Sequence, residues 1–144
     1  MKDADLYTGI VEPAKQAEYE RWLIERYGPD VSETIEASRR AAGRLSETDM
    51  ARAMDDLMRI EHGLRDAMLA GTKAENPTND ELVAAHNAWV GASWGKPCPP
   101  EAYVGLADMY LAHPDFVARY EAIAPGFSVW LTNAMKAWAA RQAT

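Results

Sequence analysis

The chain has 144 residues and 48% hydrophobic composition, enough for one domain with its own core. Its formal net charge of −7 argues against an electrostatic grip on nucleic acid or an anionic lipid surface. The single cysteine excludes an internal disulfide framework, and no cysteine–histidine cluster has zinc spacing. The sequence shows neither a signal-peptide pattern nor a run of about eighteen apolar residues. We therefore expect a soluble cytoplasmic protein that makes no membrane contact.

Residues 1–45 are predicted to form two helices. The first begins at Pro13 and is stopped by Gly28-Pro29. Its aromatic face carries Tyr19, Trp22 and Tyr27. The second helix runs from Ser32 to about Leu45 and has only a thin apolar face.

Tertiary burial supplies most of the stability of a helix in a protein. A helix with so thin an apolar face is held loosely until something covers it. We therefore expect an amino-terminal segment, residues 1–45, that is mobile without ligand, joined to a helical core, residues 46–144, within one domain.

Ser, Asn, Asp, Gly and Pro residues mark the predicted ends of five helices in the core. Ser46-Glu-Thr-Asp49 resembles a capping signal for a long helix that ends at Gly71. After a loop over Lys73–Asn79, a helix capped by Asn79 or Asp80 extends to about Trp94.

Three further helices are predicted beyond this point. One begins at Pro99 and ends near Ala112, a short one opens at His113-Pro114 and ends near Tyr120, and the last opens at Ala124-Pro125-Gly126. Since no segment alternates with period two, we expect an all-α fold without a sheet. A long helix followed by medium ones at irregular intervals indicates an orthogonal assembly of about seven helices.

Cys98 lies between Pro97 and Pro99, which keep it out of a helix interior. We expect it at an exposed loop position as the N-cap of the helix that follows. The positive end of that helix and the nearby Lys96 would both favour the thiolate, although the missing proline amides weaken the effect.

Two kinds of chemistry remain open for Cys98. It could act as a nucleophile with His86 or His113 as its base, although no local signature or orienting carboxylate supports this. It could instead be a small hydrophobe. His86, within an apolar helix, is interpreted as a hydrogen-bonded core or cleft histidine, and the aromatic residues around the thiol as mostly core.

Five short motifs follow one another from His86 to Gly126. They are His86-Asn-Ala-Trp89, Cys98-Pro-Pro-Glu101, Gly105-Leu-Ala-Asp-Met-Tyr110, His113-Pro-Asp-Phe116 and Ala124-Pro-Gly126. In their order and spacing they resemble the TipAS antibiotic-recognition domain, the effector module of MerR-type multidrug-sensing transcription activators. The resemblance also touches Glu20-Arg-Trp22, Glu25-Arg-Tyr-Gly28 and the long middle helix, so it covers nearly the whole chain.

The resemblance implies an all-α fold related to globins, without haem or another cofactor. It further implies a cleft for large, largely apolar, heterocyclic peptide antibiotics such as thiopeptides. In some members the cysteine that Cys98 matches adds to a dehydroalanine of the drug. The family also implies a homodimeric regulator whose DNA-binding part precedes this domain. We expect the sequence to be an excised piece of such a regulator or a separately translated domain.

Our first hypothesis is a drug-binding effector domain and not an enzyme, with an antibiotic as its partner and no nucleic-acid contact of its own. The expected ligand-binding residues are Cys98, His86, Trp89, Trp94, Tyr103, Tyr110, Phe116, Tyr120 and Trp22. The alternative is a thiol-dependent enzyme that uses Cys98 and His86. A third, weaker hypothesis is a haem-binding globin with His86 as the ligand.

Overall fold

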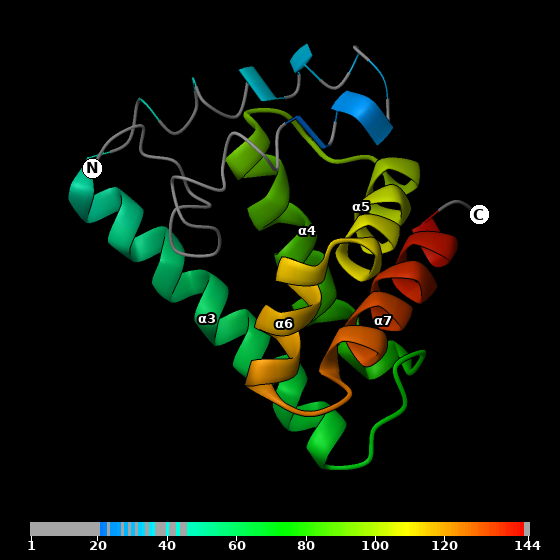
Figure 1. Ribbon diagram of the computed structural model, residues 1–144. Coiled ribbons are helices and arrows are strands. Elements are labelled where there is room, and N and C mark those ends of the chain that lie inside the picture. The colour runs from blue at the N-terminus through cyan, green and yellow to red at the C-terminus, as the bar shows by residue number, and fades with distance from the viewer. Residues whose placement is uncertain are drawn as a thin grey trace. The chain divides into compact units, whose positions relative to one another are not determined.

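In a computed structural model of the chain, the described residues are 21, 22, 24–26, 28, 30, 32, 33, 35, 36, 40, 43 and 46–142. Their regular structure is entirely helical, which confirms the all-α prediction. The helices are α3 (Glu47–Leu69), the 3₁₀ turn η3 (Pro77–Asn79), α4 (Asp80–Trp94), α5 (Pro100–Ala112), α6 (Pro114–Ile123) and α7 (Phe127–Gln142) (Figure 1). The chain divides into two compact units, residues 1–55 with 89–97 and residues 56–88 with 98–144.

Helical residues also occur in the amino-terminal part of the first unit. They are 21, 22, 24–26, 32, 33, 35, 36, 40 and 43, and they fall within the two helices predicted there. Tyr19 and Tyr27 of the predicted aromatic face lie outside the described residues, as does most of the segment 1–45 for which mobility is predicted.

Both ends of α3 have the predicted caps. Ser46 Oγ accepts the Asp49 N–H at 3.0 Å, and Asp49 Oδ2 accepts the Ser46 N–H at 3.3 Å. Asp49 thus completes a capping box in which glutamate is the usual residue. At the other end, Gly71 has φ +90°, a conformation that glycine adopts without a steric penalty.

Proline positions define the remaining helix starts. Pro100 and Pro114 are the first residues of α5 and α6, where a missing N–H costs nothing. α6 continues to Ile123, beyond the predicted end near Tyr120. The predicted loop at 73–79 contains η3, which Asn76 caps by accepting the Thr78 N–H at 2.9 Å.

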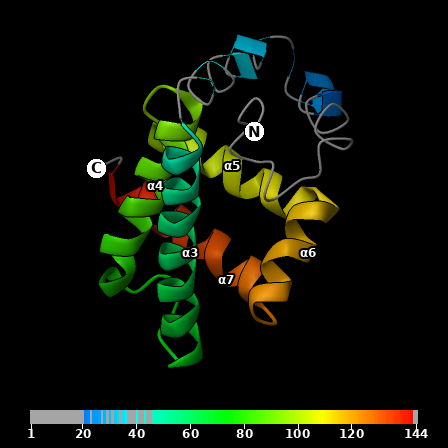
Figure 2. The same cartoon turned by 90° about the vertical axis from the view of Figure 1, so that its left-hand side faces the viewer.

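Part of the core of the second unit lies among α5, α6 and α7 (Figure 2). A row of aromatic rings lies in this part of the core. The ring centroids of Tyr110 and Phe116 are 5.0 Å apart, those of Tyr110 and Tyr120 are 5.1 Å apart, and those of Tyr120 and Phe127 are 6.2 Å apart. Burial of each such side chain stabilises the fold by about 1.5–3 kcal/mol, and ring pairs add to this. The rings therefore fix how these three helices pack together.

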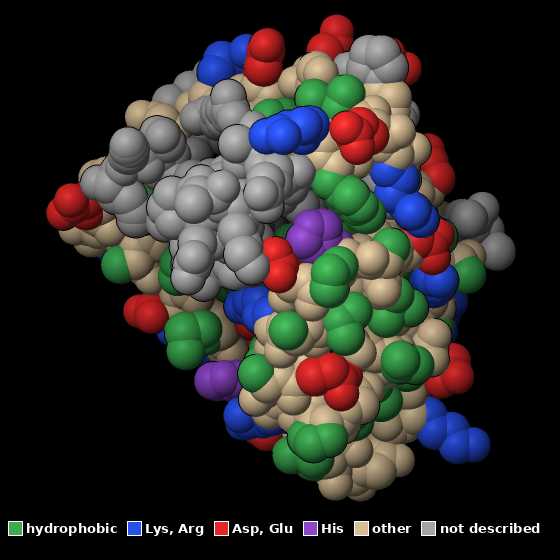
Figure 3. Space-filling view, viewed as in Figure 1, with side chains coloured by type: hydrophobic (Ala, Val, Ile, Leu, Met, Phe, Trp, Pro, Cys, Tyr) green, Lys and Arg blue, Asp and Glu red, His purple; other side chains and the backbone are tan. Residues whose placement is uncertain are grey.

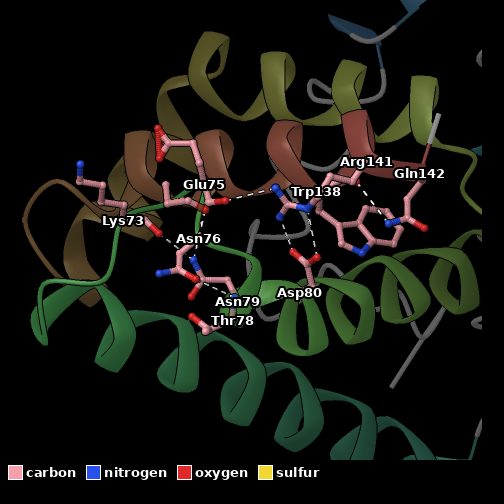
Figure 4. Close-up of polar contacts among 10 residues, drawn as sticks. Lys73, Glu75, Asn76, Thr78, Asn79, Asp80, Trp138, Arg141 and Gln142 are labelled. Carbon is pink, nitrogen blue, oxygen red and sulfur yellow. Dashed lines mark hydrogen bonds and ion pairs between the residues drawn. The ribbon is translucent and has the colours of Figure 1, made fainter. Parts of the chain in front are cut away.

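Arg141 ties the last turn of α7 to the first turn of α4 (Figure 4). Its Nε donates to Asp80 Oδ2 at 3.1 Å, its Nη2 donates to Asp80 Oδ1, and its Nη1 donates to the Glu75 carbonyl oxygen at 3.2 Å. Asp80 opens α4, where negative charge interacts favourably with the helix dipole. These contacts join segments that are 61 residues apart.

The described surface is mixed in chemistry. Acidic, basic and apolar side chains are interspersed on the face shown in Figure 3. No helix within the described residues combines the length and hydropathy that a membrane crossing requires.

Candidate functional site

Two neighbouring residues of α4, His86 and Asn87, hold the start of α5 in the second unit. His86 is 1% exposed, and its Nδ1 lies 2.5 Å from the Tyr103 hydroxyl. That hydroxyl also donates to the Val83 carbonyl oxygen at 3.4 Å. Asn87 Nδ2 donates to the Cys98 carbonyl oxygen at 3.1 Å. The interpretation of His86 as a hydrogen-bonded core histidine is confirmed.

The His86–Tyr103 pair is electrically neutral at pH 7. Burial, followed by the charge of Arg119, lowers the pKa of His86 to about 4. Burial also raises the pKa of the Tyr103 hydroxyl well above its ordinary value, and Cys98 and Tyr120 add to that rise. The contact between the two side chains is therefore a hydrogen bond between neutral groups.

Cys98 lies in the loop before α5, as predicted, but it is buried rather than exposed, with 6% of its surface accessible. The N-cap of α5 is Pro99, not Cys98, and no side chain caps this helix. The thiol thus lies one residue further from the helix than expected. Its Sγ donates to the Pro99 carbonyl oxygen at 3.8 Å.

The prediction that Cys98 favours the thiolate is wrong for this structure. Burial raises the pKa of the thiol to about 11, and hydrogen bonding by Asn87 opposes the rise without cancelling it. Removing the thiolate from water costs more free energy than one hydrogen bond from a neutral donor restores. At pH 7 the group is a protonated thiol.

The predicted site residues fall into both units. Tyr103, Tyr110, Phe116 and Tyr120 are at most 3% exposed and belong to the second unit with His86 and Cys98. Trp138 packs edge-on against Tyr103, with ring centroids 5.4 Å apart.

Trp22, Trp89 and Trp94 belong to the first unit and are partly exposed. Trp89 Nε1 donates to the Ala53 carbonyl oxygen at 2.8 Å, which joins α4 to α3 within that unit. The guanidinium of Arg26 lies 5.6 Å from the centre of the Trp22 ring.

A buried ion pair between α3 and α6 is not predicted from the sequence. Glu61, with a side chain 2% exposed, accepts two hydrogen bonds from Arg119, at 2.7 and 2.9 Å. Burial raises the pKa of Glu61, and Arg119 opposes that rise. The signal that could have revealed the pair is the position of Glu61, four residues after Leu57 and three before Leu64 on the apolar stripe of α3.

Arg119 connects this ion pair to the aromatic cluster. Its guanidinium lies 5.2 Å from the centre of the Tyr120 ring, within the range of a cation–π interaction. Its charge also contributes to the low pKa of His86. Within the described residues, no three His, Cys, Asp or Glu side chains come together as a metal site.

Comparison with known proteins gives this arrangement a family. Residues 19–138 match the TipAS antibiotic-recognition domain. The chain belongs to the TipAS family. The match extends over both units and includes every predicted site residue.

This TipAS domain is similar to a curated regulator of Caulobacter vibrioides. It is 36% identical over 139 residues to the HTH-type transcriptional regulator SkgA, both of strain NA1000 / CB15N and of strain ATCC 19089 / CIP 103742 / CB 15. The alignment covers 96% of this chain but 54% of each regulator, so the chain spans about half the length of these relatives.

A solved structure from Streptomyces lividans shares the fold. It is described as nosiheptide in complex with TipAS, part of a thiopeptide antibiotic multidrug resistance system. The similarity has a TM-score of 0.79 at 20% sequence identity and covers 95% of this chain and 94% of that chain. It confirms the all-α, globin-like fold expected for this TipAS domain.

Proposed function

We propose that this TipAS domain is the ligand-binding effector domain of a MerR-family transcription regulator and recognises large, apolar, heterocyclic peptide antibiotics of the thiopeptide type. The observation that carries the proposal is the family match over residues 19–138. Two further findings support it: the similar curated proteins are HTH-type transcriptional regulators, and the similar solved structure holds the thiopeptide nosiheptide.

The second unit supplies one group of proposed ligand contacts. We place Cys98, His86 and Tyr103 in it, together with the rings of Tyr110, Phe116 and Tyr120. These side chains are almost fully buried against one another, so a ligand has to separate some of them as it binds. Separating these side chains exposes apolar surface, which costs free energy. A large apolar ligand can offset that cost because it covers the newly exposed surface.

Trp22, Trp89 and Trp94 are proposed as further ligand contacts. Their rings offer flat apolar surface, on which heterocyclic ligands can stack. Their partial exposure supports this role.

Covalent capture at Cys98 is the finer part of the proposal. The sulfur adds to the methylene carbon of a dehydroalanine, so an S–C bond forms, the C=C π bond breaks, and the thiol proton ends on the neighbouring carbon. With a pKa of about 11, about one thiol in three thousand is ionised at pH 7.5. Covalent capture is therefore slower than reversible binding, and it takes place after the ligand has bound.

A binding role agrees better with the site than the thiol-dependent enzyme does. A catalytic base works best with a pKa near the working pH, whereas the pKa of His86 is about 4. The described hydrogen bond of the Cys98 thiol goes to the Pro99 carbonyl oxygen and not to His86. Both observations support a thiol that reacts at most once with a ligand, and they argue against a catalytic thiol that is regenerated after each reaction.

The remaining partners are proposals about the longer regulator. We propose that it acts in the cytoplasm as a homodimer and that its contact with DNA lies outside this acidic domain. The net charge of −7 supports that separation of roles.

A thermal-shift titration with nosiheptide tests the proposal. A ligand that binds only the folded state stabilises it by about 2.7 kcal/mol at a hundred times its Kd, so the Tm should rise and keep rising with concentration. A cyclic peptide of similar size without thiazole rings serves as the control. An unchanged Tm with saturating nosiheptide and with other thiopeptides would contradict the proposal.

A further inference from the structure

His86 has one ring nitrogen, Nε2, without a hydrogen-bond partner among the described residues. Its Nδ1 bonds to the Tyr103 hydroxyl at 2.5 Å, and the ring packs against those of Tyr103 and Tyr110, with centroids 5.6 and 6.4 Å apart. At 1% exposure, the residue leaves almost no surface on which bulk water could serve as the partner. Because buried polar atoms in native proteins are nearly always hydrogen-bonded, Nε2 calls for an explanation.

The contact with Tyr103 indicates which ring nitrogen carries the proton. The hydrogen bond made by one nitrogen of a neutral imidazole decides where its single N–H lies. Hydrogen bonds from N–H donors to oxygen measure about 2.7–3.2 Å, whereas those from hydroxyl donors reach down to about 2.5 Å. At 2.5 Å the Tyr103 hydroxyl is therefore the donor and Nδ1 the acceptor, and the Val83 carbonyl oxygen at 3.4 Å takes the smaller share of the hydroxyl proton. The proton of the imidazole is then on Nε2.

The surroundings of His86 suit a polar anchor. The rings of Tyr103 and Tyr110 make the site largely apolar, and a hydrogen bond is stronger where water is excluded. The edge-on ring of Trp138, 5.4 Å from that of Tyr103, holds the ring that carries the hydroxyl. Burial lowers the pKa of His86 to about 4, so the imidazole keeps a single N–H at pH 7.

We infer that the Nε2–H of His86 donates a hydrogen bond to an acceptor of the ligand, such as a ring nitrogen of a heterocycle, and that Tyr103 is the positioning residue that keeps the proton on Nε2. This inference rests on the proposed function, since the acceptor belongs to the antibiotic. It adds the atom that makes the contact and the kind of group that the atom selects. A few well-placed polar groups in an apolar site fix the orientation of a ligand.

Nitrogen NMR of protein with isotope-labelled histidine tests the position of the proton without any ligand. Spectra that correlate ring nitrogens with ring protons distinguish a protonated from an unprotonated nitrogen, and His86→Gln assigns the signals. The wild type should be protonated at Nε2. Tyr103→Phe removes the hydroxyl and should let both nitrogens share the proton. A wild-type ring protonated at Nδ1, or the same protonation in Tyr103→Phe as in the wild type, would overturn the inference.

Nosiheptide affinity tests the contact with the ligand. His86→Phe keeps a flat ring but removes the donor, so the affinity should fall about tenfold. His86→Gln has an amide N–H that can replace Nε2–H, and its affinity should stay within about threefold of the wild type. Asn133→Ala, exposed on α7, is the control and should bind as the wild type does. Each affinity is measured well below the Tm of the variant, so that unfolding does not contribute.

The outcomes separate this inference from the proposed function. If the wild type binds neither nosiheptide nor other thiopeptides, the proposed function and the ligand contact both fail, while the spectra still decide the role of Tyr103. If the wild type binds, an equal affinity in His86→Phe, or equal losses in His86→Phe and His86→Gln, would overturn the inference alone. The wild-type spectrum gives a reading even if a variant fails to fold. Its Nε2–H signal should shift when nosiheptide binds, and an unchanged signal would contradict the contact.

Discussion

The His86 ring stays neutral at physiological pH because burial and the charge of Arg119 lower its pKa to about 4. In the unfolded chain the same ring has its ordinary pKa of 6.5. The unfolded state therefore binds more protons between these two values, and the free energy of unfolding rises with pH across that window. Stability from a neutral His86 is complete above pH 6.5 and is lost as the pH falls toward 4.

This linkage predicts a measurable effect of one substitution. Between pH 7 and pH 5 the wild type should lose about 2 kcal/mol of unfolding free energy through His86, and His86→Gln should lose that much less. Urea denaturation at a series of pH values measures the difference. The exposed Asn133→Ala on α7 is the control, and it should keep the slope of the wild type because it removes no titratable group. Parallel slopes for His86→Gln and the wild type would contradict the assignment.

Single residues also show where sequence reasoning stops. The loop position of Cys98 follows from its flanking prolines, which act locally, and was predicted correctly. The state of its thiol depends on burial by residues distant in sequence and was predicted wrongly. The core role of His86 followed from its apolar helix, but its partner Tyr103 did not, because helix packing and not spacing brings the two together.

Among the helices, α6 packs its aromatic rings against α5 and α7, and an ion pair joins it to α3. Glu61 and Arg119 are both largely buried and bond at two points, so each satisfies the other's charge. Loss of one member leaves the other buried and unpaired, which is far more costly than loss of an exposed pair.

Arg119→Met should therefore destabilise the fold by about 3–5 kcal/mol. The double variant Glu61→Leu/Arg119→Met should regain most of that loss, because it continues the apolar stripe of α3 and leaves no orphaned charge. Chemical denaturation of the three proteins supplies the numbers. Arg59→Met, which removes an exposed pair with Asp56 on the same helix, should cost less than about 1 kcal/mol. A double variant no more stable than Arg119→Met would show that this explanation is wrong.

Helix boundaries were the most predictable feature of the elements. Ser46, Gly71 and Pro114 carry local backbone preferences, and α3 and α6 begin or end beside them as predicted. α5 begins at Pro100, one residue after the predicted start at Pro99. α6 ran past its predicted end near Tyr120 because no strong stop signal precedes Ala124. The pairing of α3 with α6 had no local signature, since its two charged residues are 58 positions apart.

Across the whole molecule, the segment 1–45 is predicted to be mobile without ligand and to become ordered when an antibiotic binds. Ordering backbone costs about 1–2 kcal/mol per residue, so only a ligand that covers a large apolar surface can drive it. Amide hydrogen exchange with and without nosiheptide should show protection of residues 14–45 only in the complex. α7 serves as the internal control, protected in both states.

Trp22→Ala extends the same prediction. It should weaken nosiheptide binding, because the ring is a proposed ligand contact, while hardly changing the Tm of the free protein, in which Trp22 is only partly buried. Equal and strong protection of residues 14–45 in both states would refute coupled ordering, whatever the effect of this substitution.

Native and denaturing mass spectrometry with excess nosiheptide test the central claim most directly. Wild type and Cys98→Ser should each hold one nosiheptide per chain under native conditions. After denaturation, only the wild type should retain the drug, and Cys98→Ser should release it unaltered. Absence of a native complex in both proteins, or accumulation of chemically altered free drug beyond one equivalent per chain, would contradict an antibiotic-binding effector domain.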